Sequence, residues 1–213
     1  MKGKPCATPR RGRGRPATFD RATALGQAMM LFWERGYEGT TFDELTQAMG
    51  LSPSSFYNAF GSKERLYQEA IDTFIAEGRR CLRATLAGEQ DTRAAFQALL
   101  EQEAASFTQE DRPSGCMISL AGTHLPPALA ELRCMLTNQR QATQEAMADR
   151  LRQGKAAGDV PADVDVEALA AFFNALIRGM AVQARDGASR ARLIEIIEVA
   201  MRAWPRPADD RHS

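Results

Sequence analysis

The sequence has 213 residues, of which 44% are hydrophobic and 25% are charged, and its formal net charge is zero. This composition is typical of a globular protein of one or two domains, and no apolar run approaches the roughly 18 residues that a membrane-spanning helix needs. Because the N-terminus is basic and lacks the apolar core of a signal peptide, we expect a cytoplasmic protein without a membrane partner.

Positive charge is concentrated at the N-terminus. Residues 1–61 contain eight basic and five acidic side chains, whereas the remainder contains 19 basic and 22 acidic side chains. Residues 1–18 are also rich in Pro and Gly and have little to bury, so we expect a disordered basic arm. This arm could be a solubilising or vector-derived tail. Its position before the helices described next favours a DNA-binding arm, with Arg13 and Arg15 along phosphates or in the minor groove.

The first predicted helix covers Arg21–Arg35. Asp20 can cap its N-terminus, and Gly36 can end it. Its apolar residues fall on one stripe at helical spacing, namely Leu25, Ala28, Met29 and Phe32. Such a stripe is typical of a helix that faces a hydrophobic core.

The next predicted helix begins after Thr41 and ends at Gly50. The Thr41 hydroxyl can accept a hydrogen bond from the first turn, and Glu44 can reach back to the Thr41 amide, which together form a capping box. Apolar residues recur at helical spacing between these ends. Gly50 can adopt the left-handed conformation that ends helices. The sequence therefore predicts a short amphipathic helix here.

A second short helix follows after a tight turn. Ser52 can cap it and Pro53 suits its first position, so we expect a helix from Pro53 to about Asn58. Phe56 and Phe60 lie one turn apart and can anchor it from beneath. Two short helices joined by a glycine-containing turn describe a helix-turn-helix, whose second helix enters the DNA major groove. An ordinary helical hairpin in an all-α domain would show the same pattern.

These residues resemble the TetR family of bacterial transcriptional regulators. The resemblance rests on motif residues in the family's order and spacing, which are Gly50-Leu51-Ser52, Tyr57, Phe60, Ser62-Lys63-Glu64 and Leu66. The upstream helix end also matches, through Phe32, Gly36, Tyr37 and Thr40-Thr41. The match is specific from Phe19 to about Phe74. Ala59 stands where many members have a His that contacts DNA, and Ser54 where many have Gly or another small residue, so the operator sequence does not follow from the resemblance.

The predicted recognition helix contains no Arg, Lys or Gln. Asn58 is therefore its only amide that could read a base edge, while Pro53 and Ser54 can contact thymine methyl groups. Residues suited to phosphate contacts, through hydroxyls, a helix N-terminus or a charge, are Thr41, Ser52, Ser55, Tyr57 and Lys63. We expect the affinity for DNA to depend mainly on backbone contacts and the arm, and hence strongly on salt.

The rest of the chain predicts a larger helical domain. A long helix from Ser62 to about Leu86 leaves the helix-turn-helix, and the resemblance implies that it connects ligand binding to the DNA-reading helices. Further helices are expected over residues 92–109, 127–157, 166–185 and 190–203, with a short helix or turn over 116–123. We therefore expect an all-α fold of about nine helices. It would comprise the arm (1–18), a three-helix helix-turn-helix DNA-binding domain (19–61), a connector helix (62–86), a helical ligand-binding and dimerisation domain (87–204) and a tail (205–213).

The last two predicted helices carry apolar residues on more than one face, so they must be covered on several sides. They could be buried within one chain. The resemblance instead implies a homodimer in which these helices meet their symmetry mates as a four-helix bundle, and a helix-turn-helix protein commonly reads two half-sites as a dimer.

The larger domain is also expected to hold a small-molecule effector, because helical bundles of this kind bind ligands in their cores. Side chains that could line such a pocket, each of which could equally be ordinary core, are Phe96, Leu100, Phe107, Cys116, Met117, Leu120, His124, Met135, Phe172, Phe173 and Met180.

Cys116 suggests a second sensing chemistry. The four cysteines lack metal-ligand spacing and disulfide-framework density, so we expect free thiols, no metal and no cofactor. Cys116 lies at a predicted helix N-terminus, where the helix dipole would lower the thiol pKa. Some TetR-like regulators sense electrophiles or oxidants with a thiol in this region, although a free Cys is more commonly a small buried hydrophobe.

The sequence thus predicts a dimeric, ligand-responsive repressor that releases double-stranded operator DNA when a small molecule binds. A thiol-based redox or electrophile sensor acting through Cys116 is one alternative, and an activator is another. A helical enzyme or carrier without DNA binding is a third, but the sequence contains no HExxH, GxSxG or P-loop motif. We therefore expect no enzymatic activity and no catalytic residues.

Overall fold

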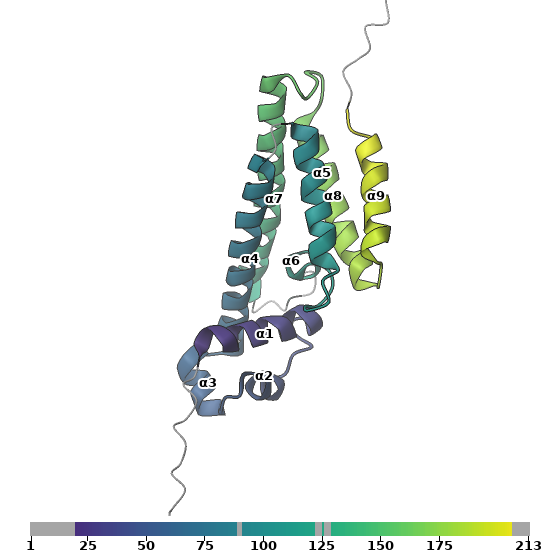
Figure 1. Ribbon diagram of the computed structural model, residues 1–213. Helices are drawn as coiled ribbons and strands as arrows, with labels where there is room; N and C mark the ends of the chain where they lie inside the picture. The colour runs from purple at the N-terminus through teal and green to yellow at the C-terminus, as the bar shows by residue number, and fades with distance from the viewer. Residues whose placement is uncertain (1–19, 89–90, 122–124, 126–128, 206–213) are drawn as a thin grey trace, which may run out of the picture.

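The structure, a computed structural model, describes residues 20–88, 91–121, 125 and 129–205, and these residues form nine α-helices and no strands (Figure 1). This confirms the all-α prediction. The helices are α1 (Arg21–Arg35), α2 (Phe42–Met49), α3 (Pro53–Phe60), α4 (Lys63–Gly88), α5 (Thr92–Phe107), α6 (Met117–Leu120), α7 (Ala130–Ala157), α8 (Val166–Arg185) and α9 (Arg190–Arg202).

Local sequence signals explain where the first helices begin and end. The Thr41 amide donates to the Glu44 carboxylate over 2.8 Å, and the Glu44 amide donates to the Thr41 hydroxyl over 3.3 Å, which confirms the capping box. Gly50 has φ 62° and ψ 32°, the left-handed conformation predicted for it. Helix α3 continues to Phe60, beyond the predicted end near Asn58, because the chain stays helical until Gly61 at φ 77°.

Other helix ends differ modestly from the predictions. Helix α5 ends at Phe107 rather than near residue 109, and α7 begins at Ala130 rather than 127. Helix α6 is shorter than the predicted segment 116–123 and spans only Met117–Leu120. Fraying and mixed turn geometry at helix ends make such boundaries the least predictable part of a helix.

The helix-turn-helix and the start of the larger domain share one hydrophobic core. Helices α1 to α4 supply most of it, and it continues into α6 and α7 through the buried residues Met117, Ile118, Leu132 and Leu136. In Figure 1, α1 lies across the base of α4, which then runs upward beside α7. Because packed cores deform little, a displacement of α4, α6 or α7 reaches the helices beneath them.

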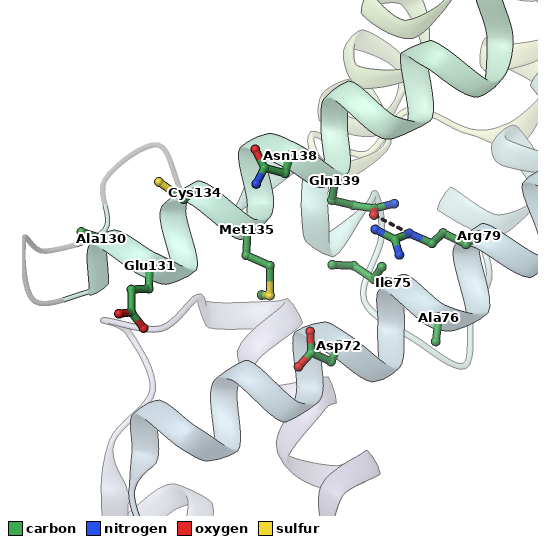
Figure 2. Close-up of a pocket in the computed structure, with 10 residues that line it drawn as sticks. All are labelled: Asp72, Ile75, Ala76, Arg79, Ala130, Glu131, Cys134, Met135, Asn138 and Gln139. Carbon is green, nitrogen blue, oxygen red and sulfur yellow. Dashed lines mark hydrogen bonds between the residues drawn. The ribbon is translucent and has the colours of Figure 1, made fainter. Parts of the chain in front are cut away.

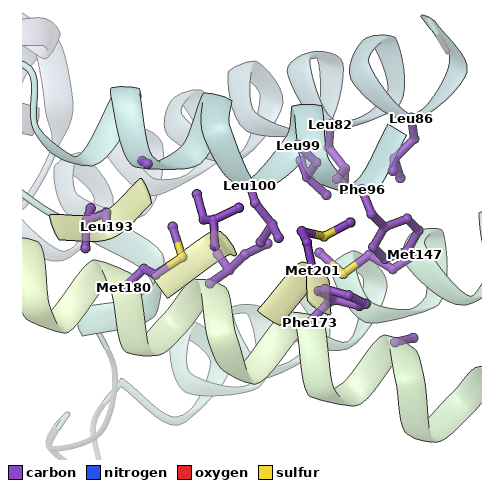
Figure 3. Packing of buried hydrophobic residues seen from close by; sticks show 14 of the residues in the cluster. Leu82, Leu86, Phe96, Leu99, Leu100, Met147, Phe173, Met180, Leu193 and Met201 are labelled. Carbon is purple, nitrogen blue, oxygen red and sulfur yellow. The ribbon is translucent and has the colours of Figure 1, made fainter. Parts of the chain in front are cut away.

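A second hydrophobic core fills the larger domain between α4, α5, α7, α8 and α9 (Figure 3). Phe96, Leu99 and Leu100 of α5 are completely buried in it, and Phe173 and Met180 of α8 are buried against them. The rings of Phe96 and Phe173 lie 5.0 Å apart between centroids. These side chains fix the relative positions of the helices that enclose the cavity described below.

The sequence suggested no membrane-spanning segment, but by length and mean hydropathy alone α8 is apolar enough to cross a membrane. In the most apolar 18-residue stretch of α8, 33% of the residues are buried within the chain. One side of α8 packs in the second core, while Phe172 and Val182 on another side are each 45% exposed. Val199 of the adjacent α9 is 63% exposed. The apolar composition of α8 thus reflects a core-facing side and a second apolar side that faces solvent.

Candidate DNA interface and effector cavity

Helix α3 presents polar side chains to solvent, as predicted. Ser54, Ser55 and Asn58 are exposed, and the Tyr57 side chain is 56% exposed. The Tyr57 ring stacks on that of Phe42 at a centroid distance of 5.3 Å, yet the residue remains more exposed than buried. The helix therefore offers hydroxyls and one amide to an external partner.

The opposite side of α3 is held by aromatic packing. Phe56 is completely buried, and its ring lies 4.9 Å from that of Phe42 on α2 in an edge-to-face arrangement. Phe60 is 5% exposed, and the Arg21 guanidinium lies 4.6 Å from its ring centroid. Arg21 also donates to Glu69 of α4 over 2.7 Å. Contacts to α1 and α2 thus fix the orientation of α3, and the ion pair of Arg21 with Glu69 joins α1 to α4.

Three hydroxyls gather at the N-terminus of α3. The Ser52 hydroxyl accepts from the Ser55 amide over 3.2 Å, and it lies 3.1 Å from the Ser54 hydroxyl and 2.9 Å from the Ser55 hydroxyl. A helix N-terminus carries free amide groups and partial positive charge, so this end suits a phosphate. The Thr41 hydroxyl is already hydrogen-bonded to Glu44 within the capping box. To contact a phosphate, this hydroxyl would have to divide its hydrogen bonding between Glu44 and the phosphate.

The remaining predicted DNA contacts fall in two places. Lys63 begins α4 next to the recognition helix, and its ammonium lies 4.2 Å from the centroid of the Tyr37 ring. Pro53 occupies the first position of α3 and is exposed. Arg13 and Arg15, like the whole arm, lie outside the described residues.

The larger domain contains a cavity of about 440 Å³ enclosed by α4, α5, α6, α7 and α8, which we call the inner cavity. Its size is within the range of pockets that hold drug-sized ligands. Apolar side chains line part of it, and they include Phe74, Leu82, Phe107, Ile118 and Ile177. The same wall carries Glu103, Cys116 and several arginines, so the cavity can offer both apolar surface and charged groups.

The inner cavity does not gather all residues predicted to line a pocket. Phe107 and Cys116 line it. Phe96, Leu100, Phe173 and Met180 are packed in the second core instead, Met117 is buried in the first core, and Phe172 faces solvent. Met135 borders a separate groove, and His124 and the side chain of Leu120 lie outside the described residues. Sequence reasoning missed the charged residues of the cavity, because charged side chains on amphipathic helices usually face water.

Burial changes the acid–base properties of two groups in the inner cavity. The pKa of Glu103 is raised to about 7, and burial is the cause. Burial also raises the pKa of the Cys116 thiol, and the nearby Glu103 raises it further. The prediction of a lowered thiol pKa is therefore wrong: α6 has only four residues, and its dipole does not outweigh the loss of solvation. A thiol with a raised pKa is a poor nucleophile near neutral pH.

Glu103 should make the stability of the protein depend on pH. Its ordinary pKa is 4.5 and its pKa in the folded chain is about 7, so the folded state binds more protons between these values and stability falls as pH rises through this window. Between pH 5 and pH 8, we expect the unfolding free energy of the wild-type protein to fall by roughly 2 kcal/mol relative to that of Glu103→Gln. The fall is smaller than the pKa difference alone would give, because the residue is partly exposed.

Denaturant titrations of both proteins at several pH values measure this difference. Other titrating groups are common to both proteins and cancel in the comparison. Parallel profiles of unfolding free energy for the two proteins would show that Glu103 is ionised and solvated in the folded state.

A second hollow, which we call the outer groove, lies between α4 and α7 and is shown in Figure 2. It is open to solvent and is bordered by Asp72, Met135 and Asn138. The Arg79 Nε donates to the Gln139 Oε1 over 2.7 Å, and both residues line the outer groove and the inner cavity. This hydrogen bond joins α4 to α7 where the two hollows meet. Among the described residues, no cluster of three His, Cys, Asp or Glu could hold a metal ion.

Direct contacts connect the inner cavity to α1. Phe74 lines the cavity, and its ring meets the Trp33 ring edge-on at a centroid distance of 5.0 Å. Arg112, also in the cavity wall, lies 5.9 Å from the Trp33 ring centroid. At the end of α8, the Arg185 guanidinium donates to the Glu34 carbonyl oxygen. A ligand that displaces Phe74 or Arg112 would therefore act on the helix that packs beside the recognition helix.

Two family profiles match most of the chain. The profile described as "Bacterial regulatory proteins, tetR family" matches residues 24–70. The profile described as "Tetracyclin repressor-like, C-terminal domain" matches residues 92–200. The first match covers the helix-turn-helix and the start of α4, and the second covers α5, α6, α7 and α8, which enclose the inner cavity together with α4.

Individual relatives match over nearly their whole length. The transcriptional repressor ComR of Escherichia coli (strain K12) is 34% identical over 197 residues, which cover 92% of this chain and 94% of ComR. The solved structure of a cysteine mutant of the TetR family regulator CifR, complexed with 26-base-pair double-stranded operator DNA, is 41% identical with a TM-score of 0.85 and covers 90% of this chain and 100% of that one. A TetR transcriptional regulator from Chloroflexus aurantiacus is 26% identical with a TM-score of 0.74, over 85% of this chain and 92% of that one.

Proposed function

Because this chain belongs to the TetR family of bacterial regulatory proteins, we propose that it is a transcriptional repressor that binds double-stranded operator DNA and releases it when a small-molecule effector occupies the inner cavity. The observation that carries the proposal is the exposed polar side of α3 on its buried aromatic underside. This arrangement can place hydroxyls and Asn58 in a major groove. Such a protein acts in the cytoplasm, where the DNA is.

The protein is proposed to act as a homodimer through α8 and α9. Three of the exposed large hydrophobic side chains, Phe172, Val182 and Val199, lie on these two helices. A second copy packed against them would cover this apolar surface and form a four-helix bundle. The two recognition helices would then read two half-sites related by the dimer axis.

Release of DNA requires that the effector prefers a conformation in which the two recognition helices no longer fit the operator. The contact of Phe74 with Trp33 and the core shared by α4, α6 and α7 provide a physical route for this preference. No covalent step at Cys116 is needed, and the raised pKa of its thiol does not favour one.

The affinity for operator DNA should fall steeply with salt, and the basic arm should account for part of this dependence. Deletion of residues 1–18 removes six basic side chains from each protomer. Loss of the phosphate contacts proposed for Arg13 and Arg15 alone removes four contacts per dimer, so the slope of log K against log salt should decrease by about 2–4 or more. Fluorescence anisotropy with a labelled operator at several salt concentrations measures the slope.

The operator for this titration comes from selection of bound genomic fragments with the full-length protein. Folding of the deletion variant is verified by its unchanged thermal unfolding. An affinity that barely changes between low and physiological salt would contradict the proposed mode of DNA binding. Small molecules made or consumed by the proteins encoded beside the selected fragments are the first compounds to test for release of the operator.

A further inference from the structure

One end of the inner cavity carries uncompensated positive charge. Arg140 of α7 and Arg178 of α8 both line the cavity, and both are partly buried. Burial lowers the pKa of Arg140 below its ordinary value, and the positive charge of Arg178 lowers it further. The two guanidinium groups are therefore close enough to repel each other. Among the described residues, neither has a carboxylate within ion-pairing distance.

The contacts that Arg140 does make are neutral. It donates to the Thr137 hydroxyl over 3.1 Å and to the Ala121 carbonyl oxygen over 3.5 Å. The other arginines of the cavity wall each have an acid nearby. Arg79 donates to Gln139, and its charge acts on the Asp72 carboxyl, where it opposes the rise in pKa caused by burial. Arg112 lies near Asp111 with an N–O separation of 3.7 Å. The charge that lacks a counter-charge is thus confined to the end of the cavity formed by α7 and α8.

The two kinds of charge in the cavity respond differently to burial. Glu103 can relieve its poor solvation by taking up a proton, because burial raises its pKa to about 7. An arginine keeps its proton at any physiological pH. A negative group placed between or beside Arg140 and Arg178 would therefore relieve their repulsion, which loss of a proton cannot do.

We propose that the effector is an organic anion whose oxyanion head is bound by Arg140 and Arg178 and whose apolar body lies along Ile177, Leu82 and Phe107. This inference rests on the proposed function and names the chemical class of its effector. A carboxylate or phosphate monoester would accept several charge-assisted hydrogen bonds from two planar guanidinium groups. The apolar side chains of the cavity wall would bury the rest of the molecule.

The test uses the full-length protein and four probes that each contain eight carbon atoms in an unbranched chain: octanoate, octyl phosphate, the neutral octanamide and the cationic octylamine. Binding is measured by the shift of the thermal unfolding midpoint and by release of the selected operator. We expect octanoate or octyl phosphate to bind about tenfold or more tightly than octanamide, since hydrogen bonds to charged groups are stronger than those to neutral ones. The ratio of the two anions identifies the head group.

Two substitutions test whether the head group of the anion binds at Arg140 and Arg178. Arg178→Gln and Arg140→Gln should each weaken binding of the anion by about tenfold to a hundredfold and leave binding of octanamide unchanged. Arg178→Gln should also leave the unliganded protein as stable as the wild type or more stable, because like-charge repulsion is removed, whereas Arg140→Gln also loses the bonds to Thr137 and Ala121. Arg133→Gln is the matched control: it removes an exposed arginine of the same helix, outside the cavity lining.

Two results would overturn the inference. One is that neither anion binds better than octanamide, and the other is that octylamine binds best, which would assign Glu103 the leading role. If the protein binds its operator and octanamide or octylamine releases it, the proposed function stands and the anion site is wrong. If the protein binds no genomic DNA, the proposed function fails, while the unfolding shifts still decide whether the anion site exists.

Discussion

Replacing Phe56 with Ala should cost about 3–5 kcal/mol of stability and abolish operator binding. Phe56 is completely buried beneath the recognition helix, and its ring contacts those of Phe42 and Phe60 at centroid distances of 4.9 Å and 5.9 Å. The truncation leaves a cavity under a helix of only eight residues, and few other contacts can hold α3 in place. The unfolding free energy and the operator affinity of the purified variant measure the two effects.

The neighbouring residue provides a matched control with the opposite outcome. Tyr57 is 56% exposed, so Tyr57→Phe removes only a hydroxyl in solvent and should change the unfolding free energy by less than about 0.5 kcal/mol. We expect it to weaken operator binding by about tenfold, because a hydrogen bond to a charged phosphate oxygen is lost. Unchanged operator affinity in Tyr57→Phe, or wild-type affinity in Phe56→Ala, would contradict the proposed orientation of α3.

The helix-turn-helix was predictable because its signals are local. The capping box of Thr41 and Glu44, the left-handed Gly50 and the phenylalanines one turn apart each act over a few residues, and the structure reproduces all of them. Helix α3 extends two residues beyond its predicted end near Asn58, because Gly61 determines where it stops.

The inner cavity was not predictable in the same way. Helical periodicity shows that Phe96 and Phe107 face inward, but it does not show that the former meets other side chains while the latter borders a hollow. Glu103, Arg140 and Arg178 come from three helices and have the sequence pattern of solvent-facing charges. Only the packing of α5, α7 and α8 brings them to one wall, so their role depends on tertiary contacts that sequence spacing does not encode.

At the end of the larger domain remote from α3, Gly154→Ala should strongly destabilise the protein. The Thr92 amide donates to Asp159 over 2.8 Å, and the Arg150 guanidinium donates to the Leu86 carbonyl oxygen over 3.0 Å, so this junction joins the ends of α4, α5 and α7. A Cβ atom at Gly154 would lie 2.5 Å from the Asp159 Oδ1 and 2.8 Å from the Val160 Cγ2, and it would also overlap the Thr92 hydroxyl.

Relief of this overlap requires the buried Thr92 or the 158–160 turn to move, and either movement strains the hydrogen bonds between Thr92 and Asp159. We expect a cost of about 2–4 kcal/mol, which for a chain of this size lowers the unfolding midpoint by about 5–15 °C. Calorimetry of the purified variant measures the midpoint. At temperatures well below this midpoint, the variant should retain its affinity for the operator, because the junction adjoins the second core and not the core beneath α3.

Gly26→Ala is the matched control, since the same methyl group is added within a helix. A Cβ atom at Gly26 in α1 would meet nothing within 4 Å, so the higher helix propensity of Ala should stabilise the protein by up to about 1 kcal/mol. If Gly154→Ala lowers the unfolding free energy and Gly26→Ala raises it, the cost at Gly154 comes from the crowded junction. A Gly154→Ala protein as stable as the wild type would mean that the ends of α4, α5 and α7 can separate without loss, and that the helices around the inner cavity are held by the apolar core alone.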